Sequence, residues 1–241
     1  IWSQTLLPKE VIVVEDFSHD QTRETLKDIS LQFPEGWIKV IFLESNVGPA
    51  SARNIGWELA TEKYIAFLDA DDSWHPQKIE LQYLWMETHA HVGLLGHKYD
   101  VSSESGSPTE VVEVEFNQLR CKPVPPWSLL LTNKFSTPTV MVRNASPYRF
   151  QEGARYAEDY LLWLQICLDG RGCWIIDAPL ATLYKAPYGD SGLSSHLARM
   201  QIGEFNAYIT LHKRGSLGTF SLVFLFLCSA MKFVRRLVIR G

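Results

Sequence analysis

The chain has 241 residues and a mass of 27.5 kDa, the size of one large domain or of one domain with a short extension. Hydrophobic residues make up 46% and charged residues 21%, which excludes a disordered, collagen-like or coiled-coil protein. Lys and Arg number 23 against 27 Asp and Glu, a net charge of −4, so we expect no nucleic-acid partner.

The four cysteines form no CxxC pair and have no histidine at metal-binding spacing. We therefore expect neither a zinc site nor a disulfide framework. Reduced thiols fit a cytoplasmic protein, and the residues from Ile1 onward show no signal-peptide pattern.

The amino-terminal part of the chain alternates short apolar strands with helices. Strands are expected at residues 10–14, 38–43 and 64–68, with helices over 20–33 and near 52–59. This order predicts an α/β sheet with parallel strands and right-handed crossovers. Ligands of such sheets bind beyond the carboxyl ends of the strands, where the polar clusters of this sequence lie.

The remainder of the chain is less regular, with helices expected over 76–88 and 160–168. Extended segments are expected at residues 92–101, 111–116, 139–142, 174–176 and 181–184.

Three carboxylates, Asp69, Asp71 and Asp72, directly follow the third expected strand. Their mutual repulsion is costly unless a cation or a hydrogen-bond network offsets it. Hard oxygen ligands in small number suit Mg²⁺ or Mn²⁺, which keep water and substrate phosphates in their coordination shell. The alternative is a solvated Asp-rich turn that caps the next helix. An EF-hand loop is excluded because Trp74 occupies the position of its obligatory glycine.

An apolar strand followed by Asp-x-Asp also occurs in aspartyl-phosphate hydrolases, with Asp69 as nucleophile and Asp71 as acid/base. That pattern normally follows the first strand of its domain. Here two strand–helix units precede it, so this interpretation stays the second choice.

Four segments stand in an order and spacing typical of one family. They are VIVVEDFSHD at 11–20, NVGPASARNIGWELA at 46–60, YIAFLDADDSWHPQKIE at 64–80 and YAEDYLLWLQI at 156–166. Together they resemble the family 2 glycosyltransferases over most of residues 1–200. The resemblance implies a GT-A fold, a mixed and mainly parallel sheet flanked by helices. It also implies a nucleotide-diphosphate sugar donor, a divalent cation (Mn or Mg) and inversion at the anomeric carbon.

The same resemblance assigns roles to single residues. The acidic position after the first strand accepts hydrogen bonds from the donor's base, and glutamate replaces the family's first aspartate there. Backbone amides at a helix start, beside an arginine, suit the oxygens of a nucleotide or diphosphate. The residues implied in donor binding are Glu15, Asp16, Ser18, Asn46, Gly48, Arg53, Asp69 and Lys185.

The family's metal motif corresponds to Asp71 and Asp72 together with Asp69, and the division among the three stays open. Glu158 and Asp159 match the family's Glu-Asp pair at a helix start. An inverting single displacement needs a base that takes the acceptor's hydroxyl proton, and Asp159 is the candidate.

An apolar stretch, 217–231, is followed by Lys232, Arg235, Arg236 and Arg240. It is shorter than the roughly 20 residues that span a bilayer, so a segment lying in the membrane interface is expected. A terminal helix packed on the domain is the alternative. The expected division is a glycosyltransferase domain over 1–215 and this tail over 216–241.

Family members begin with a strand upstream of the one at residues 10–14, so we expect the latter to be the second strand of the fold. The implied function is sugar transfer to a hydroxyl of a surface polysaccharide or lipid-linked glycan. The expected location is the cytoplasmic face of the plasma membrane, with peripheral contact through residues 217–241. A catalytically inactive nucleotide-binding relative is a further alternative.

Overall fold

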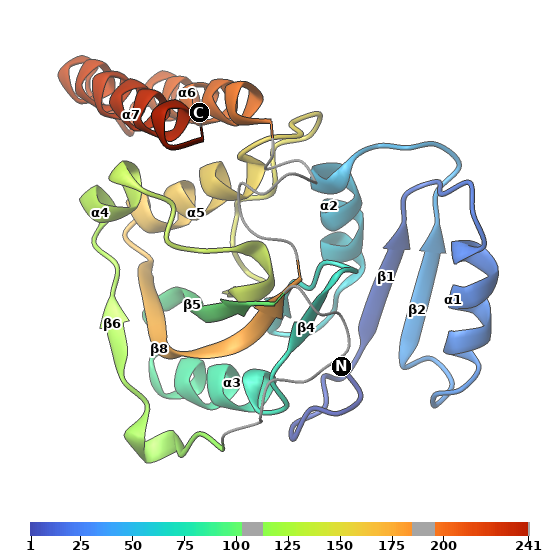
Figure 1. The fold of residues 1–241 in the computed structure, drawn as a ribbon. Coiled ribbons are helices and arrows are strands. Elements are labelled where there is room, and N and C mark those ends of the chain that lie inside the picture. The colour runs from blue at the N-terminus through green and yellow to red at the C-terminus, as the bar shows by residue number, and fades with distance from the viewer. Residues whose placement is uncertain (103–112, 185–195, 241) are drawn as a thin grey trace.

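The computed structural model describes residues 1–102, 113–184 and 196–240, with side chains up to residue 236. Two parallel strands, β1 (Val11–Glu15) and β2 (Ile38–Phe42), form a small sheet. Helix α1 (Thr22–Ser30) joins them and lies beside β2 (Figure 1). The strand–helix–strand unit expected at the amino-terminal side is therefore confirmed.

The second sheet has six strands. They are β3 (Tyr64–Ala66), β4 (Asp72–Trp74), β5 (Val92–Val101), β6 (Cys121–Pro123), β7 (Met141–Arg143) and β8 (Gly172–Leu183).

The pairing of this sheet follows the order β3-β7-β5-β8-β4, and β6 also pairs with β8. Strands β3 and β5 both run antiparallel to β7, and β8 runs parallel to β5. Strands β4 and β6 run antiparallel to β8. Hence β3, β5 and β8 share one direction and β4, β6 and β7 oppose them, so the sheet is mixed, and the described parallel pairs are β1–β2 and β5–β8.

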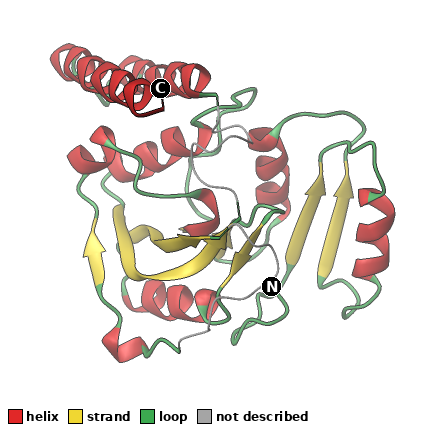
Figure 2. Cartoon of the chain, viewed as in Figure 1, coloured by secondary structure: helices red, strands yellow, loops and turns green. Residues whose placement is uncertain are grey.

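Helices cover both faces of this sheet (Figure 2). Helix α5 (Glu158–Leu168) lies on one face and α3 (Lys78–Thr88) on the other. Successive residues of a strand point to opposite faces, so Leu94 packs in the cluster around α5 and Leu95 in the cluster around α3. Short α4 (Pro126–Leu131) and α2 (Pro49–Leu59) complete the α5 side.

Two expectations about strands differ from the structure. Residues 113–115 are irregular and Phe116–Gln118 form a 3₁₀ turn, so the strand expected at 111–116 is not formed in its described part. The segments at 174–176 and 181–184 belong to one strand, β8. Its register against β5 shifts near Pro179, which allows the strand to continue through the polar and proline residues between them.

The carboxyl-terminal end forms two packed helices, α6 (Leu197–Lys213) and α7 (Thr219–Arg240). Phe205 and Phe226 pack with ring centroids 4.7 Å apart. Lys232 Nζ lies 2.7 Å from Glu204 Oε1 and donates to the carbonyl of Leu131 in α4 at 2.7 Å. One face of α7 is thus fastened to α6 and α4.

Candidate active site

The carboxyl ends of β1 and β2 meet at the loop that follows β1. Asp16 accepts hydrogen bonds from the amides of Val47 at 2.7 Å and Gly48 at 2.9 Å, and Asn46 donates to the Asp16 carbonyl at 3.0 Å. The φ of Gly48 is +85°, a conformation that favours glycine, and Gly48 directly precedes α2. The structure therefore brings together Asp16, Asn46 and Gly48, as expected for a nucleotide-binding loop.

Glu15 is buried beneath this loop, and its carboxylate is used within the protein. It accepts the backbone amide of Ser18 and the Nε of Arg23, the latter at 2.6 Å. Burial by itself raises the pKa of Glu15, but these two donors outweigh it and hold the pKa below its ordinary value. The hydrogen bond between Ser18 and Glu15 thus stabilises the loop that contains Asp16.

Arg53, on α2, connects two of the expected motifs. Its guanidinium lies 2.7 Å from Asp69 Oδ1 and 3.0 Å from Glu158 Oε1. Desolvation lowers the pKa of Arg53, but Asp69 and Glu158 outweigh it and the net shift is upward. In this structure the guanidinium of Arg53 pairs with these two carboxylates. The sequence analysis expected it to bind oxygens of the donor's diphosphate.

The aspartate cluster forms a tight turn between β3 and β4. The amide of Asp72 donates to the carbonyl of Asp69 at 3.1 Å, and Asp71 is exposed at the tip. Among the described residues, no three metal-binding side chains converge on one point. Exposed hard oxygens suit a cation that takes its other ligands from a diphosphate. Because Asp69 already pairs with Arg53, the donor set fits a cation on Asp71 and Asp72.

Asp159 lies in the first turn of α5. Its Oδ2 accepts the hydroxyl of Thr137 at 3.3 Å and its Oδ1 accepts the Tyr160 amide at 2.6 Å. Burial, and then the charge of Glu158, raises the pKa of Asp159 to about 7, although Arg53 opposes the shift. A carboxylate with this pKa suits a general base at neutral pH.

The backbone conformation just before α5 sets the direction of the acidic pair, Glu158 and Asp159. Ala157 has φ +57°, a left-handed conformation rare for a residue with a side chain, and it directly precedes Glu158. Such strained positions persist where the surrounding structure holds them, often at functional sites. Here Glu158 is buried and faces Arg53, so the helix start is tied to the Asp69 turn.

Two further residues join the site. Thr137, in the segment 136–139 that resembles family loops near the donor diphosphate or the acceptor, contacts Asp159. Arg155, which the sequence analysis did not single out, donates from Nη2 to Asn46 Oδ1 at 3.3 Å. Arg155 precedes the Glu-Asp pair by only three residues, a proximity that could have drawn attention to it. Lys185, the remaining candidate for donor binding, lies outside the described residues.

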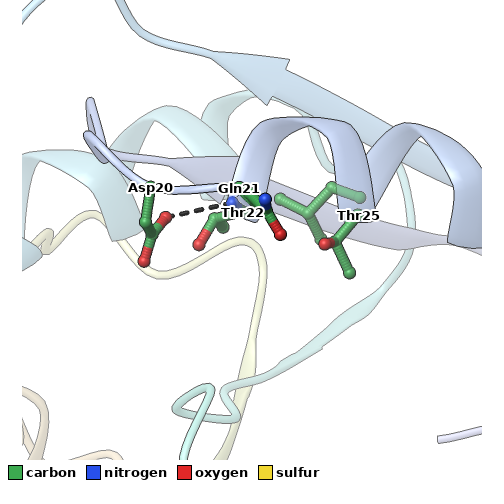
Figure 3. Close-up of a pocket in the computed structure, with 5 residues that line it drawn as sticks. Asp20, Gln21, Thr22 and Thr25 are labelled. Atoms are coloured by element: carbon green, nitrogen blue, oxygen red, sulfur yellow. Dashed lines mark hydrogen bonds between the residues drawn. The ribbon is translucent and has the colours of Figure 1, made fainter.

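A hollow of about 470 Å³ lies at the start of α1 (Figure 3). Its lining comes entirely from that helix start, and Asp20 Oδ1 accepts the Thr22 amide at 3.0 Å. This is a local helix cap, separate from the Asp69–Arg53–Glu158 contacts.

The model of glycosyl transferase family 2 matches residues 1–151. The chain belongs to this family. The acidic pair, Glu158 and Asp159, lies beyond the matched range, at the start of α5.

Several relatives share most of this chain. An uncharacterized glycosyltransferase of Haemophilus influenzae is 29% identical over 221 residues, 92% of this chain and 83% of the relative. WfgD of Escherichia coli, a UDP-Glc:alpha-D-GlcNAc-diphosphoundecaprenol beta-1,3-glucosyltransferase, is 30% identical over 70% of this chain and 62% of its own length. An uncharacterized glycosyltransferase of Rickettsia felis is far longer, since the match covers 25% of it at 32% identity.

Solved structures share the fold. TarS of S. aureus (residues 1–349) in complex with UDP-GlcNAc superposes with a TM-score of 0.65 at 22% identity, over 87% of this chain and 60% of that one. The mannosyltransferase PcManGT of Pyrobaculum calidifontis, in complex with GDP-Man and Mn²⁺, gives 0.63 at 15% identity, over 100% of this chain and 69% of that one. At these identities the likeness establishes the GT-A fold.

Proposed function

We propose that this protein transfers a sugar, with inversion, from a nucleotide-diphosphate donor to a hydroxyl of a surface polysaccharide or lipid-linked glycan. The observation that carries the proposal is Asp159, a carboxylate with a pKa of about 7, beside the Asp69–Arg53–Glu158 ion pairs. The acceptor class is supported by the names of two relatives. WfgD acts on a diphosphoundecaprenol-linked sugar, and TuaG of Bacillus subtilis, 37% identical over 42% of this chain and 39% of its own length, is a putative teichuronic acid biosynthesis glycosyltransferase.

In this proposal the donor's base lies against Asp16 and its diphosphate against the Asp69–Asp72 turn. Asp71 and Asp72 hold the divalent cation, Mn or Mg, which neutralises charge on the leaving diphosphate. The loop amides at Val47 and Gly48 already donate to Asp16, so the carboxylate is oriented before the donor arrives.

Asp159 removes the proton from the acceptor hydroxyl as that oxygen attacks the anomeric carbon. The bond between this carbon and the diphosphate oxygen breaks in the same displacement, so the configuration at the carbon inverts. Thr137 orients the carboxylate through its hydroxyl, and Arg53 pairs with Glu158 beside it. Because the chain belongs to glycosyltransferase family 2, the Asp69 cluster can be explained without assuming an aspartyl-phosphate hydrolase.

Contact with a membrane surface at its cytoplasmic face is part of the proposal. Within the described residues, no helix combines the length and apolarity needed to cross a bilayer. The face of α7 that turns away from α6 is nevertheless apolar, and each of its stripe residues is more than half exposed. The stripe consists of Phe220, Val223, Phe224, Leu227, Met231 and Val234. Together with the exposed Arg235, it suits an interface that carries anionic headgroups.

The experiment that tests the transfer is a screen of nucleotide sugars with Mn²⁺, followed by product analysis. Slow hydrolysis of one donor, or transfer to an added glycan with inverted anomeric configuration, is expected. A protein that binds UDP and consumes no donor from the panel would be the inactive nucleotide-binding relative.

A further inference from the structure

Three polar side chains are enclosed between α3 and the sheet. Lys78 and Gln82 of α3 are fully buried, and His97 of β5 is 1% exposed. Lys78 and Gln82 lie four residues apart, so they are neighbours on one face of the helix. Long polar side chains are rarely buried in full, and where they are, hydrogen bonds normally satisfy their polar atoms.

Hydrogen bonds and charge place these three side chains in one cluster. The side-chain amide nitrogen of Gln82 donates to the carbonyl of Leu95 at 2.7 Å. His97 follows Leu95 by two residues in β5, so both side chains point to the face of the sheet that α3 covers. Burial, and then the charge of Lys78, lowers the pKa of His97 to about 3, an effect that requires the two groups to be close. Lys78, Gln82 and His97 therefore converge on one place in the interior.

Each of the three side chains has one buried polar atom that forms no hydrogen bond within the part of the chain that the structure describes. These atoms are Nζ of Lys78, Oε1 of Gln82 and Nε2 of His97. A buried polar atom without a partner destabilises the folded state, because it has lost its hydrogen bonds to water. One ligand that bonds to all three atoms would remove this destabilisation.

The chemistry of the three atoms defines that ligand. His97 Nδ1 lies 2.6 Å from the carbonyl oxygen of Lys98, which only accepts, so Nδ1 carries the proton and Nε2 of the uncharged ring is an acceptor. Gln82 Oε1 is also an acceptor, since the amide nitrogen of this side chain donates to two carbonyls. Lys78 Nζ, which lies 3.9 Å from the centre of the Trp74 ring, is the donor of the set. A water molecule accepts from one such donor and donates to two such acceptors.

Other small ligands fit this set less well. An anion would be repelled by the two acceptor atoms. A divalent metal would bring a double charge into the interior, and no carboxylate or thiolate belongs to the set to neutralise it. Burial lowers the pKa of Lys78 well below its ordinary value, which favours an uncharged amine and an uncharged ligand.

The cluster lies against a turn of the candidate active site. Gln82 donates to the carbonyl of Thr139 at 3.0 Å. Trp74, which follows the aspartate turn in β4, donates its indole N–H to the carbonyl of Pro138 at 2.8 Å. Both carbonyls belong to the 3₁₀ turn that begins at Thr137, the residue that contacts the proposed base. A ligand held by the cluster therefore stabilises this turn from the side of α3.

We propose that Lys78, Gln82 and His97 bind one water molecule in the protein interior, and that this water joins α3 to β5 beneath the turn that begins at Thr137. Lys78 donates to the water oxygen, and the water donates to Gln82 Oε1 and His97 Nε2. The site does not rest on the proposed function, because neither its atoms nor its ligand take part in sugar transfer.

A crystal structure of the full chain, together with nitrogen NMR of its histidine rings, tests the site in the wild-type protein. We expect one water oxygen within about 2.6–3.2 Å of Lys78 Nζ, Gln82 Oε1 and His97 Nε2. The His97 ring should carry its proton on Nδ1 and keep this form from about pH 5 to about pH 8, because its pKa is about 3. Direct contact among the three side chains, a metal or chloride ion at the site, or a proton on Nε2 would overturn the inference.

Lys78→Met gives a second readout, in which the sign of the change decides. If Lys78 donates to a bound water, the substitution should lower the folding equilibrium constant at least about fivefold, because the water loses its donor. If the amine has no ligand, methionine should raise the constant, since a buried polar group without a partner is removed. Lys134→Met, at an exposed lysine, is the matched control and should leave the constant unchanged. Equilibrium unfolding in denaturant measures both variants, and unchanged or increased stability of Lys78→Met contradicts the inference.

Discussion

Asp159 shows how a single side chain gains reactivity from its surroundings. An ordinary aspartate is ionised at neutral pH and is a weak base, whereas burial and the charge of Glu158 raise the pKa of this one to about 7. Arg53 limits the shift, because its guanidinium pairs with Glu158 and Asp69 nearby. The result is a carboxylate that is ionised in part at neutral pH and basic enough to accept a hydroxyl proton.

Replacing Asp159 with asparagine should lower transfer by roughly 10²- to 10⁴-fold, because the amide accepts no proton. UDP affinity should remain within a few-fold, since in the proposed mechanism Asp159 faces the acceptor. Turnover with a panel donor and calorimetry with UDP measure the two effects. Asp169→Asn, at the opposite end of α5, is the matched control and should keep its activity. Full turnover in Asp159→Asn would show that the carboxylate only stabilises its helix.

The raised pKa of Asp159 also predicts a pH dependence. Activity should rise with pH to a plateau, with a midpoint near the pKa of about 7, because the deprotonated form is the base. Stability should move in the opposite direction. A carboxyl whose pKa is raised on folding contributes stability below its unfolded value, near 3.8, and loses it as the pH rises through about 7.

Melting curves of the wild type and Asp159→Asn check this sign. The asparagine variant should gain in Tm relative to the wild type between about pH 4 and about pH 7, where the unfolded carboxyl is already ionised and the folded one is still protonated, and the difference should stay constant above that range. A Tm difference that does not change over this range would mean that Asp159 titrates near its ordinary pKa.

At the scale of elements, the turn into α2 depends on one backbone conformation. Gly48 has φ +85° and its amide donates to Asp16, so the turn holds the expected nucleotide loop together. Gly36 has a similar φ of +78°, and a Cβ there would meet no atom within 4 Å. Substitutions at these two glycines can therefore be compared: both introduce backbone strain, but only the one at Gly48 lies in the expected nucleotide loop.

Alanine at either glycine should cost about 1–2 kcal/mol of unfolding free energy, because a side chain disfavours the left-handed conformation. Only Gly48→Ala should also weaken UDP binding, by displacing the amides that orient Asp16. Denaturant unfolding and UDP calorimetry on both variants measure this. If both variants lost UDP affinity equally, general destabilisation would explain the result.

The exposed stripe of α7 makes a second prediction at this scale. Phe224→Ser with Leu227→Ser should abolish flotation of the protein with anionic liposomes and leave UDP binding unchanged, because both side chains point away from α6. Arg235→Gln should reduce flotation on anionic vesicles and have little effect on neutral ones. If the wild-type protein floats with neither anionic nor neutral vesicles, the stripe has another role.

At the scale of the whole molecule, the site is assembled from segments far apart in the sequence. Arg53, Asp69 and Glu158 meet across as many as 105 positions, and Arg155 reaches Asn46 across 109. The contacts exist because α2 and α5 pack in one hydrophobic core with Trp57, Phe67 and Trp163. The core thereby determines the distance between the Asp16–Gly48 loop contacts and the acidic pair.

The proposed cation belongs to this scale, because in the proposal it joins the Asp69–Asp72 turn to the donor. Chelation of Mn²⁺ should weaken UDP binding by at least about tenfold, and Asp71→Asn should do the same with Mn²⁺ present. Calorimetry with and without chelator measures both. Asp100→Asn, an exposed aspartate on β5, is the control and should bind UDP as the wild type does. Equal UDP affinity in the two conditions would remove the metal from the proposal.

Local patterns in the sequence were sufficient for most elements. The runs at 10–14 and 38–43 and the helix near 52–59 are confirmed because burial periodicity is a short-range property. The strand expected at 111–116 was wrong in its described part, since the amide and carbonyl of Val114 bond to the side chain of Gln77, a tertiary contact that the local pattern does not reveal.

The sequence by itself determined the family, the fold class and the position of the acidic motifs, because residue type and spacing carry that information. Tertiary structure decided how the motifs act. Glu15 is bound within its own loop, Arg53 pairs with Asp69 and Glu158, and burial shifts the pKa of Asp159 to about 7. Ion pairing and desolvation depend on distances between segments that are remote along the chain, and packing of the common core sets those distances.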